Sequence, residues 1–326
     1  MLFRSHLDIK SLRLFLGIIK HRSITKASRH LYIAQPALGL YLRRLEDELG
    51  VELVTRHARG VTPTAAGLKL AEHAERLISQ MHYIKNELQN LRDTPSGPAL
   101  VGLTHGTGQL LAAQLVKRIA IEYPDVSVCL RDSISESLAK MLNDGRLDLA
   151  LCYAPSDDQD LRFKPVGIET LVLTYWKDSV GQDVPEEIQF KDLVDYPLIL
   201  PSKKFEYRKL VEGFAEQIGV ELNVVHEVES VQPIRYLIRE GLGFSVGSVG
   251  AVKWEVESGH VGTARIVNPT PVRTLYLAEN MSRPSSRAIE VVRDQLVALV
   301  AEVAHENPDI LSVEGFDLYE DSEQLD

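Results

Sequence analysis

Residues 23–50 read SITKASRHLYIAQPALGLYLRRLEDELG and predict two helices joined by a tight turn. Ser23 can cap the first helix, because its side-chain oxygen can accept a hydrogen bond from a backbone amide of the first turn. Gln35-Pro36 opens the second helix, where Pro loses no hydrogen bond. Gly50 ends it, and its buried stripe consists of Leu38, Leu42, Leu45 and Leu49. This arrangement predicts a helix-turn-helix.

An earlier helix and a later hairpin complete this segment. Asp8 can cap a helix whose apolar positions recur at helical spacing, at Leu12, Phe15, Leu16 and Ile19. Residues 56–60, RHARG, predict a turn between two short strands, which would form a basic wing. The sequence therefore predicts a winged helix-turn-helix domain over residues 1–67.

The face opposite the buried leucines is predicted to contact DNA. The start of the second helix would enter the major groove, with Gln35 at base edges and Arg43 at a phosphate. The wing arginines would meet the DNA backbone or the minor groove. The predicted DNA-binding residues are Thr25, Lys26, Gln35, Pro36, Ala37, Gly39, Leu40, Arg43, Arg56 and Arg59. A small helical bundle with solvated arginines is the alternative, but the ordered caps, turn and wing favour DNA binding.

The charge distribution agrees with a polyanion-binding head. Residues 1–95 contain 15 Lys and Arg against 9 Asp and Glu, whereas the remaining residues contain 21 against 37. The head is therefore net basic although the whole chain has a formal charge of −10. Attraction to phosphate is a property of the local surface, so an acidic body does not exclude it.

Residues 64–93 predict a long helix with an apolar heptad seam. Thr64 can cap this helix, and residues 94–98, TPSGP, predict a hinge after its end. The stripe could lie on the protein's own body, but a long helix attached to a small DNA-binding head favours pairing with a second copy. A dimer also places two heads on the two halves of a palindrome. The seam consists of Leu70, Ala74, Leu77, Met81, Ile84, Leu88 and Leu91.

From residue 99 onward, short apolar strands alternate with helices, as in parallel βαβ units. Strands are expected at 99–103, 126–130, 147–152, 171–175, 198–200, 224–228, 243–246 and 274–278, with a closing helix at about 285–304. The length favours two subdomains around a cleft, one formed by 99–169 and 269–304 and the other by 170–268. Residues 305–326 contain eight acidic residues and no Lys or Arg, which predicts a disordered acidic tail.

In open α/β folds, ligands bind beyond the carboxyl ends of strands and near helix N-termini. This rule selects polar and small residues that follow the predicted strands or begin the predicted helices. Hydroxyl groups and free amides there suit a small carboxylate or aromatic acid. Helix capping alone explains any one of these hydroxyl groups. The set is Thr104, His105, Thr107, Ser133, Ser135, Tyr153, Pro201, Ser202, Ser230, Val231, Gly247 and Ser248.

Enzymatic and redox hypotheses find less support in the sequence. Gly102-x-x-x-Gly106-x-Gly108 lacks the phosphate-loop Lys and the dinucleotide spacing, and no nucleophile elbow accompanies His105. The scattered His and the two Cys predict no metal site and no cofactor. Cys129 and Cys152 should lie on strands separated by a third, about 9–10 Å apart, which is too far for a disulfide. We therefore expect both to be core residues.

Spaced motifs throughout the chain give it a family resemblance. In the head they are Leu12-Arg13-x-Phe15, Ser23-Ile24-Thr25-x-Ala27, Leu31, Gln35-Pro36-Ala37-Leu38, Arg44-Leu45-Glu46-x-x-Leu49-Gly50 and Thr64-x-Ala66-Gly67. In the body they are Glu122-Tyr-Pro124, Gly145-Arg-Leu-Asp-Leu-Ala-Leu151 and Arg239-Glu-Gly-Leu-Gly243. The chain resembles the LysR-type transcriptional regulators over nearly its whole length, the tail excepted.

The resemblance implies an effector domain like the periplasmic binding proteins, dimerisation through the linker helix, and effector contacts at Thr104, Ser135 and Ser202. It also implies a homodimer or homotetramer that acts with RNA polymerase. The chain departs from the family at the DNA-contacting face, where Ala34 and Gly39 replace Ser and Leu40 and Tyr41 replace residues that are often polar. An unusual base preference is therefore expected.

The sequence thus predicts a regulator without catalytic activity that binds a palindromic operator and responds to a small-molecule effector. The alternative is a solute-binding or catalytic α/β protein whose N-terminal head serves only assembly. With two unpaired cysteines, no signal peptide and no membrane-spanning apolar run, a cytoplasmic location is expected.

Overall fold

The computed structural model describes residues 7–89, 94–153, 155–156, 158–179, 183–203, 205–283 and 285–316. The chain divides into two compact units, Met1–Gln89 with Asp144–Arg146 and Asn90–Asn143 with Leu147–Asp326. No helix among the described residues has the length and apolar content that a membrane crossing needs.

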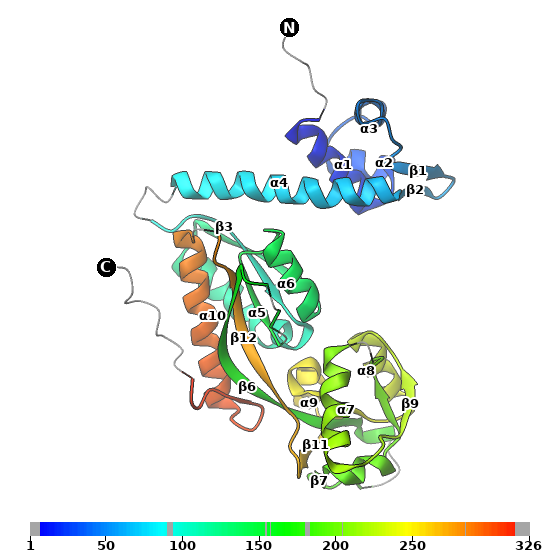
Figure 1. The fold of residues 1–326 in the computed structure, drawn as a ribbon, viewed down its shortest axis with the longest axis vertical. Coiled ribbons are helices and arrows are strands. Elements are labelled where there is room, and N and C mark those ends of the chain that lie inside the picture. The colour runs from blue at the N-terminus through cyan, green and yellow to red at the C-terminus, as the bar shows by residue number, and fades with distance from the viewer. Residues whose placement is uncertain are drawn as a thin grey trace. The chain divides into compact units, whose positions relative to one another are not determined.

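The first unit contains a winged helix-turn-helix head and a long helix (Figure 1). The predicted caps form: Asp8 accepts a hydrogen bond from the Ser11 amide at 2.7 Å, and Ser23 accepts one from the Lys26 amide at 3.3 Å. Gly50 ends the third helix in the left-handed conformation, with φ 67°. The elements are α1 (Ile9–His21), α2 (Ile24–His30), α3 (Gln35–Leu49), β1 (Val54–His57), β2 (Gly60–Pro63) and α4 (Ala65–Gln89).

The core of the head forms where the helical apolar stripes meet the wing. Leu38, Leu42 and Leu45 of α3 are each at most 1% exposed. They pack with residues of α1, α2, β1 and β2 in one cluster. Leu70 and Ala71 of α4 pack against the same cluster. The start of α4 is therefore part of the head's own core.

Farther along α4, the apolar side chains are exposed. Leu77, Met81, Ile84 and Leu88 have exposed fractions of 51%, 43%, 48% and 65%. Leu91, the last residue of the predicted seam, lies outside the described residues. Leaving a row of large apolar groups in water is unfavourable, so this part of α4 needs a covering surface.

The second unit consists of two lobes joined by long strands. Its strands are β3 (Gly97–Leu103), β4 (Val126–Asp132), β5 (Leu149–Cys152), β6 (Leu161–Trp176), β7 (Glu187–Gln189), β8 (Leu198–Leu200), β9 (Val224–Glu227), β10 (Ser245–Ser248), β11 (Val261–Val267), β12 (Val272–Asn280) and β13 (Leu311–Ser312). Its helices are α5 (His105–Glu122), α6 (Ser135–Asn143), α7 (Glu206–Ile218), α8 (Val231–Arg239), α9 (Lys253–Glu257) and α10 (Arg287–Glu306), with 3-10 turns η1 (Lys177–Ser179), η2 (Phe190–Asp195) and η3 (Val249–Val252).

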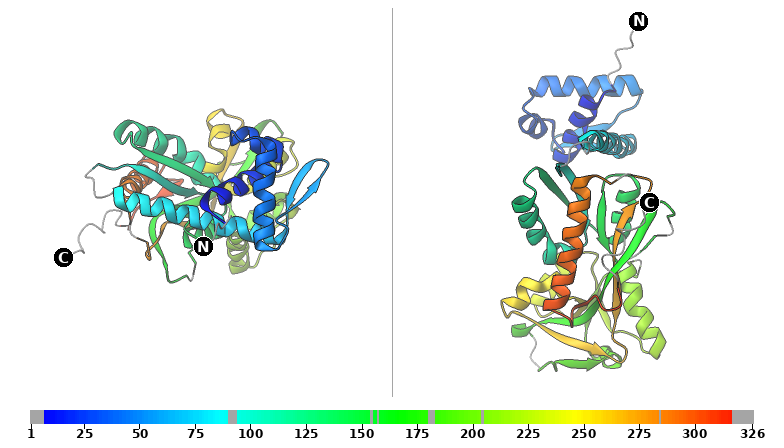
Figure 2. Two further views of the ribbon diagram at one scale, coloured as in Figure 1. Left: turned by 90° about the horizontal axis from the view of Figure 1, so that it is seen from above. Right: turned by 90° about the vertical axis from the view of Figure 1, so that its left-hand side faces the viewer.

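The main sheet has the order β4-β3-β5-β12-β6-β11-β7, and β10 and β13 also pair with β6. β6 runs as one strand from the lobe that carries α10 to the lobe that carries α7 (Figures 1 and 2). It pairs with β12 through Thr170 and with β10 and β11 from Leu171 onward. Separate apolar clusters fill the two lobes, one around β3, β5 and α10 and one around β8, β10 and α7.

The pairing is parallel only in part. β3 is parallel to β4 and β5, as the alternation of strands and helices predicts, but β12 runs antiparallel to both β5 and β6. The difference arises because β6 and β12 cross between the lobes in opposite directions. Both therefore enter the sheet as neighbours without a helix between them.

Three expectations require correction. β3 begins at Gly97, so the last two residues of the predicted hinge pair with β4. The predicted tail begins too early, because α10 continues to Glu306 and Leu311, only 4% exposed, pairs with Glu169 of β6. Residues 317–326 lie outside the described residues. Cys152 is buried as expected, but Cys129 is exposed, because most of the sheet-edge strand β4 faces solvent.

Candidate functional site

The face that the sequence predicts to contact DNA is the exposed side of α3. Gln35, Pro36, Leu40 and Arg43 are exposed, whereas Ala37 and Gly39 are half-buried. Leu40 is an apolar residue with 43% of its surface exposed. A side chain added at Gly39 would meet no atom within 4 Å, so the backbone is open on this side of the helix. The face can therefore approach a partner closely and offers both polar and apolar contacts.

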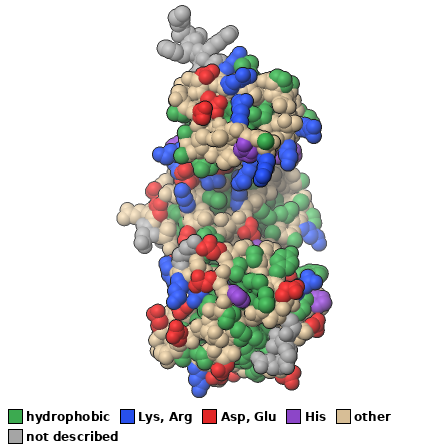
Figure 3. Space-filling model, turned by 90° about the vertical axis from the view of Figure 1, so that its right-hand side faces the viewer, with side chains coloured by type: hydrophobic (Ala, Val, Ile, Leu, Met, Phe, Trp, Pro, Cys, Tyr) green, Lys and Arg blue, Asp and Glu red, His purple; other side chains and the backbone are tan. Residues whose placement is uncertain are grey.

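The wing is held by backbone contacts to the helices. The Val61 amide donates to the Arg22 carbonyl at 3.0 Å. Gly60 has φ +136°, and a Cβ there would lie 2.2 Å from the same carbonyl oxygen, so only glycine fits. Arg56 and Arg59 of the wing are exposed. Thr25 and Lys26 of α2 are exposed as well. Figure 3 shows Lys and Arg side chains gathered on the head.

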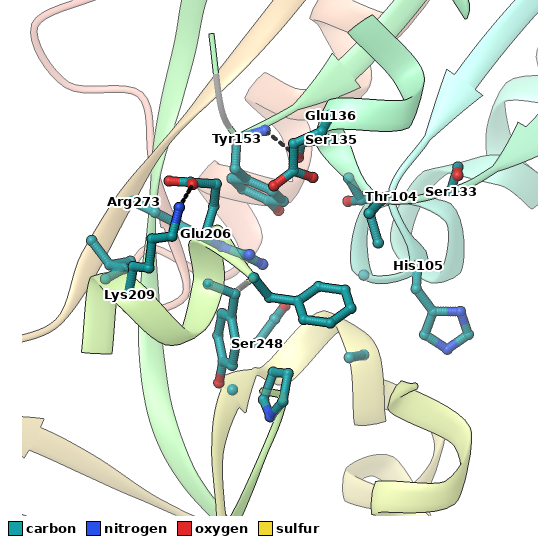
Figure 4. Close-up of a pocket in the computed structure, with 18 of the residues that line it drawn as sticks. Thr104, His105, Ser133, Ser135, Glu136, Tyr153, Glu206, Lys209, Ser248 and Arg273 are labelled. Carbon is teal, nitrogen blue, oxygen red and sulfur yellow. Dashed lines mark hydrogen bonds and ion pairs between the residues drawn. The ribbon is translucent and has the colours of Figure 1, made fainter. Parts of the chain in front are cut away.

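A cavity of about 1520 Å³ lies between the two lobes of the second unit. Its polar rim comes from residues at the ends of strands and the starts of helices, as the rule for open α/β folds predicts. In Figure 4, Thr104, His105 and Ser133 lie on one side and Tyr153 and Arg273 on the other. Of the predicted effector residues, those that line the cavity are Thr104, His105, Ser133, Ser135, Tyr153, Pro201, Ser230, Gly247 and Ser248.

Two hydroxyl groups on the lobe that carries α10, called here the first lobe, are held in place by local hydrogen bonds. Thr104 precedes α5 but makes no side-chain capping bond, and its Oγ1 lies 3.1 Å from Oγ1 of Thr107. Thr107 in turn donates to the Thr104 carbonyl at 3.0 Å. Ser135 begins α6, and its Oγ accepts a hydrogen bond from the Tyr153 amide at 3.0 Å. With the Thr107 proton on that carbonyl, Thr104 is the donor in the contact between the two hydroxyl groups, and its oxygen can still accept a hydrogen bond from a ligand.

Thr107 and Ser202 do not line the cavity. Thr107 is 2% exposed because it faces inward from the first turn of α5. Ser202 donates to Glu229 at 3.2 Å. The backbone of Val231 begins α8, but its side chain lies outside the described part of the chain. Sequence position alone could not separate these residues from those that face the cavity, because all follow strands or begin helices.

Sequence reasoning missed the charged network on the cavity floor. Arg273 of β12 donates to Oε2 of Glu169 through Nε at 2.7 Å, and its Nη2 lies 2.6 Å from the same oxygen. Ser248 donates to Glu169 Oε1 at 2.7 Å. Arg273 and Glu169 are cross-strand partners. No local sequence signal reveals this pair, because it depends on the pairing of strands about a hundred residues apart.

Burial and the Glu169 carboxylate together set the protonation of these groups. Burial would lower the pKa of Arg273, but the Glu169 carboxylate raises it overall, so the guanidinium is charged. Burial raises the pKa of the Tyr153 and Tyr207 phenols, so both hydroxyl groups are neutral. Tyr207 also lines the cavity.

His105 does not have the contacts of a catalytic base. Its Nδ1 lies 3.2 Å from Oδ2 of Asp132, and its Nε2 lies 2.9 Å from the side-chain amide of Gln109. Both ring nitrogen atoms therefore have partners, and neither is left to take a proton from a serine hydroxyl. Within the described residues, no three His, Cys, Asp or Glu gather in a way that could hold a metal ion.

The cysteines do not form a redox pair. β3 lies between β4, which carries Cys129, and β5, which carries Cys152, and both thiols are free. Burial raises the pKa of Cys152 to about 12, so its thiol stays protonated and weakly reactive.

Comparison with known proteins agrees with this two-part organisation. Residues 9–68 match the model of the bacterial regulatory helix-turn-helix protein, lysR family, and residues 92–301 match the LysR substrate binding domain. The nitrogen assimilation regulatory protein nac of Klebsiella aerogenes is 30% identical, covering 93% of this chain and 99% of its own. The HTH-type transcriptional regulator BbuR of Bordetella bronchiseptica is 29% identical, covering 92% of each chain.

Solved structures show the same fold. CbnR, a LysR family transcriptional regulator, superposes with a TM-score of 0.70 at 16% identity, covering 90% of this chain and 99% of its own. Full-length CbnR complexed with its target DNA gives a TM-score of 0.67 at 17% identity, over 91% of this chain and 99% of that one. With both domain models matched in order along one chain, the protein belongs to the LysR family of DNA-binding transcriptional regulators, with a DNA-binding head followed in sequence by an effector-binding domain.

Proposed function

We propose that α3 of each head recognises one half of a palindromic operator, that α4 pairs two copies of the chain, and that a small carboxylate or aromatic acid in the cavity switches the DNA-bound assembly. The exposed row on α4 carries this proposal. Leu77, Met81, Ile84 and Leu88 leave large apolar surfaces uncovered on a helix that continues directly from the DNA-binding head. Pairing two such helices covers the row and brings two heads together.

DNA recognition divides between the base-contacting and phosphate-contacting residues of the head. Gln35 lies at the exposed start of α3, where a side chain can reach base edges. Arg43 lies two turns later, and Arg56 and Arg59 lie on the wing, where positive charge suits the DNA backbone. Exposed Leu40 adds an apolar contact that can meet a thymine methyl group.

The cavity supports effector binding between two lobes. Thr104 and Ser135 belong to the first lobe and Ser230 and Ser248 to the second, so one ligand can contact both lobes. A ligand that binds one arrangement of the lobes more tightly shifts the population toward that arrangement.

The proposed function includes no catalytic step. The response would reach RNA polymerase through a dimer or a tetramer assembled on the operator, in the cytoplasm, where a chromosomal operator lies.

The first test separates base recognition from phosphate contacts. Duplexes selected from a random pool by the wild-type protein supply the operator for mobility-shift measurements. Gln35→Ala should relax the preference at one base pair per half-site by about 1–3 kcal/mol. Arg43→Ala should weaken all duplexes alike and flatten the dependence of affinity on salt. Equal, sequence-independent losses from both changes would show that the DNA-contacting face is misassigned.

The same measurement tests the alternative class. A solute-binding or catalytic protein with an assembly head would select no sequence from the pool. Its residual DNA binding would be equally sensitive to Gln35→Ala and to the loss of any exposed polar residue of the head. Selection of a palindrome by the full chain supports the regulator.

A further inference from the structure

We propose that Arg273 and the hydroxyl group of Tyr207 form a carboxylate-binding subsite on the floor of the cavity, an inference that rests on the proposed role of this cavity as the effector site. The ligand class is a small monocarboxylic acid with an apolar body. Neither residue belongs to the polar rim that sequence position predicts.

The guanidinium group of Arg273 is held by an ion pair that leaves some of its N–H donors available. Glu169 accepts from Nε and contacts Nη2, so the ion pair occupies one side of the planar fork. Arginine carries five N–H donors, and this pair employs two of them. The Nη1 end lies outside the ion pair. Arg273 lines the cavity, and Figure 4 shows its side chain extending into it between Tyr153 and Ser248.

Aromatic rings hold the guanidinium group in this orientation. Its central carbon lies 3.5 Å from the ring centroid of Tyr153 and 5.6 Å from that of Tyr207. The ring of Tyr153 packs against the flat face of the cation, which favours its charge and limits its rotation. Ser248 holds Glu169 from the other side at 2.7 Å. The Nη1 end of the guanidinium group is therefore held in a fixed orientation before any ligand binds.

Tyr207 supplies a second donor. Its hydroxyl oxygen is buried and has no hydrogen-bond partner among the residues that the structure describes. Buried polar atoms are normally paired, so an unpaired hydroxyl group facing a cavity indicates a missing partner. A Cβ at Gly247 would lie 3.5 Å from this oxygen, so the hydroxyl group lies beside another residue that lines the cavity. Because burial raises the phenol's pKa, the group remains a neutral donor.

These donors match one carboxylate. One ligand oxygen can accept from the Nη1 end of Arg273 and the other from the Tyr207 hydroxyl. A monoanion is preferred over a dianionic phosphate, because Glu169 already balances the positive charge and a second buried negative charge would be unpaired. Leu210 and Phe214 line the cavity from α7 and provide an apolar wall for the rest of the ligand.

Two pairs of probes test the charge requirement on the full-length protein: acetate against acetamide and benzoate against benzamide. Dissociation constants are measured from carbonyl carbon NMR titrations with 13C-labelled probes. Both carboxylates should bind at least about tenfold more tightly than their amides, the equivalent of one charge-assisted hydrogen bond. Carboxylates that bind no better than amides would overturn the proposal.

Tyr207→Phe removes only the unpaired hydroxyl group. The variant should melt at or above the wild-type temperature without ligand, since an unsatisfied polar atom is lost, yet bind acetate and benzoate about five- to tenfold more weakly. Tyr196→Phe is the matched control, because Tyr196 is a half-buried tyrosine of the same lobe that does not line the cavity. Wild-type affinity in Tyr207→Phe contradicts the proposed subsite.

Arg273→Lys keeps the positive charge opposite Glu169, so the buried carboxylate stays paired and the fold is preserved. The lysine ammonium group lacks the planar fork of N–H donors that could bind Glu169 and a ligand at the same time. The variant should lower carboxylate affinity about tenfold or more while its operator affinity without ligand stays at the wild-type value. Unchanged carboxylate binding would remove Arg273 from the subsite. In that case intact operator binding would show that the regulator assignment stands although the subsite does not.

Discussion

At the scale of a single residue, the Asp148 carboxyl group contributes to the pH dependence of the second unit. One of its oxygens accepts a hydrogen bond from the Leu100 amide at 2.8 Å. Burial nevertheless dominates and raises its pKa from 3.8 to about 6. The folded protein therefore holds a proton between about pH 4 and 6 that the unfolded chain has already released.

Stability should consequently fall as the pH rises through this window. The group contributes nothing below pH 4, where it is protonated in both states, and its full cost of up to about 3 kcal/mol is present above pH 6. Asp148→Asn, which keeps an acceptor for Leu100, should remove this component from urea unfolding curves measured between pH 4 and 7. The exposed Asp125→Asn serves as the control, and identical pH profiles for Asp148→Asn and the wild type would contradict the interpretation.

Thr104 and Ser202 give opposite predictions although both follow strands. Thr104→Val removes a hydroxyl group that lines the cavity and caps no helix. The affinity for an effector found by thermal-shift screening should fall about 10- to 100-fold, because a buried ligand atom loses its partner. Ser202→Ala should leave that affinity nearly unchanged, since Ser202 does not line the cavity and its hydroxyl group donates to Glu229. A loss of fold in Thr104→Val would indicate a structural role instead.

At the scale of elements, α4 has two functions that divide along its length. Leu70 and Ala71 pack on the core of the head, whereas the exposed row begins at Leu77. Leu77→Asp with Ile84→Asp should therefore dissociate the dimer without unfolding the head, since each change places a charge in the interface. Sedimentation velocity should show the monomer mass, together with loss of palindrome binding.

Leu68→Asp is the matched control for α4. Leu68 is 57% exposed and lies on the opposite side of the helix from Leu77, so its change should leave the dimer intact. Dissociation by Leu68→Asp, or a dimer that survives the double change, would place the interface elsewhere.

The elements differ in how well the sequence predicts them. The helices of the head follow from caps and apolar spacing, which are local. β6 was expected only over residues 171–175, because Arg162, Lys164 and Pro165 interrupt the apolar pattern of its first half. Those residues are half-buried in a strand that pairs with β12. The same long-range pairing brings Arg273 to Glu169, so the rim of the cavity could be predicted and its floor could not.

For the whole molecule, the basic head and acidic remainder predict steep salt sensitivity. If Lys26, Arg43, Arg56 and Arg59 of both heads meet phosphates, log affinity should fall with log salt with a slope of roughly −7. Changing Arg56 and Arg59 to Gln should reduce that slope by roughly 3–4. Lys177→Gln with Lys191→Gln removes the same charge from the second unit and should leave the slope unchanged. A similar change of slope in both variants would mean that net charge, rather than the wing, governs binding.

The strand crossing also makes the second lobe an insertion with adjacent ends. The chain leaves the first lobe after Thr170 and returns at Val272, and these two residues are cross-strand partners. Insertions whose ends lie side by side are readily exchanged between hosts. Residues 171–271 therefore form a transplantable cassette. Exchanging these residues for the corresponding segment of another family member would replace one wall of the cavity, while the first lobe keeps its own apolar core. Such an exchange would combine a new ligand specificity with an existing operator preference.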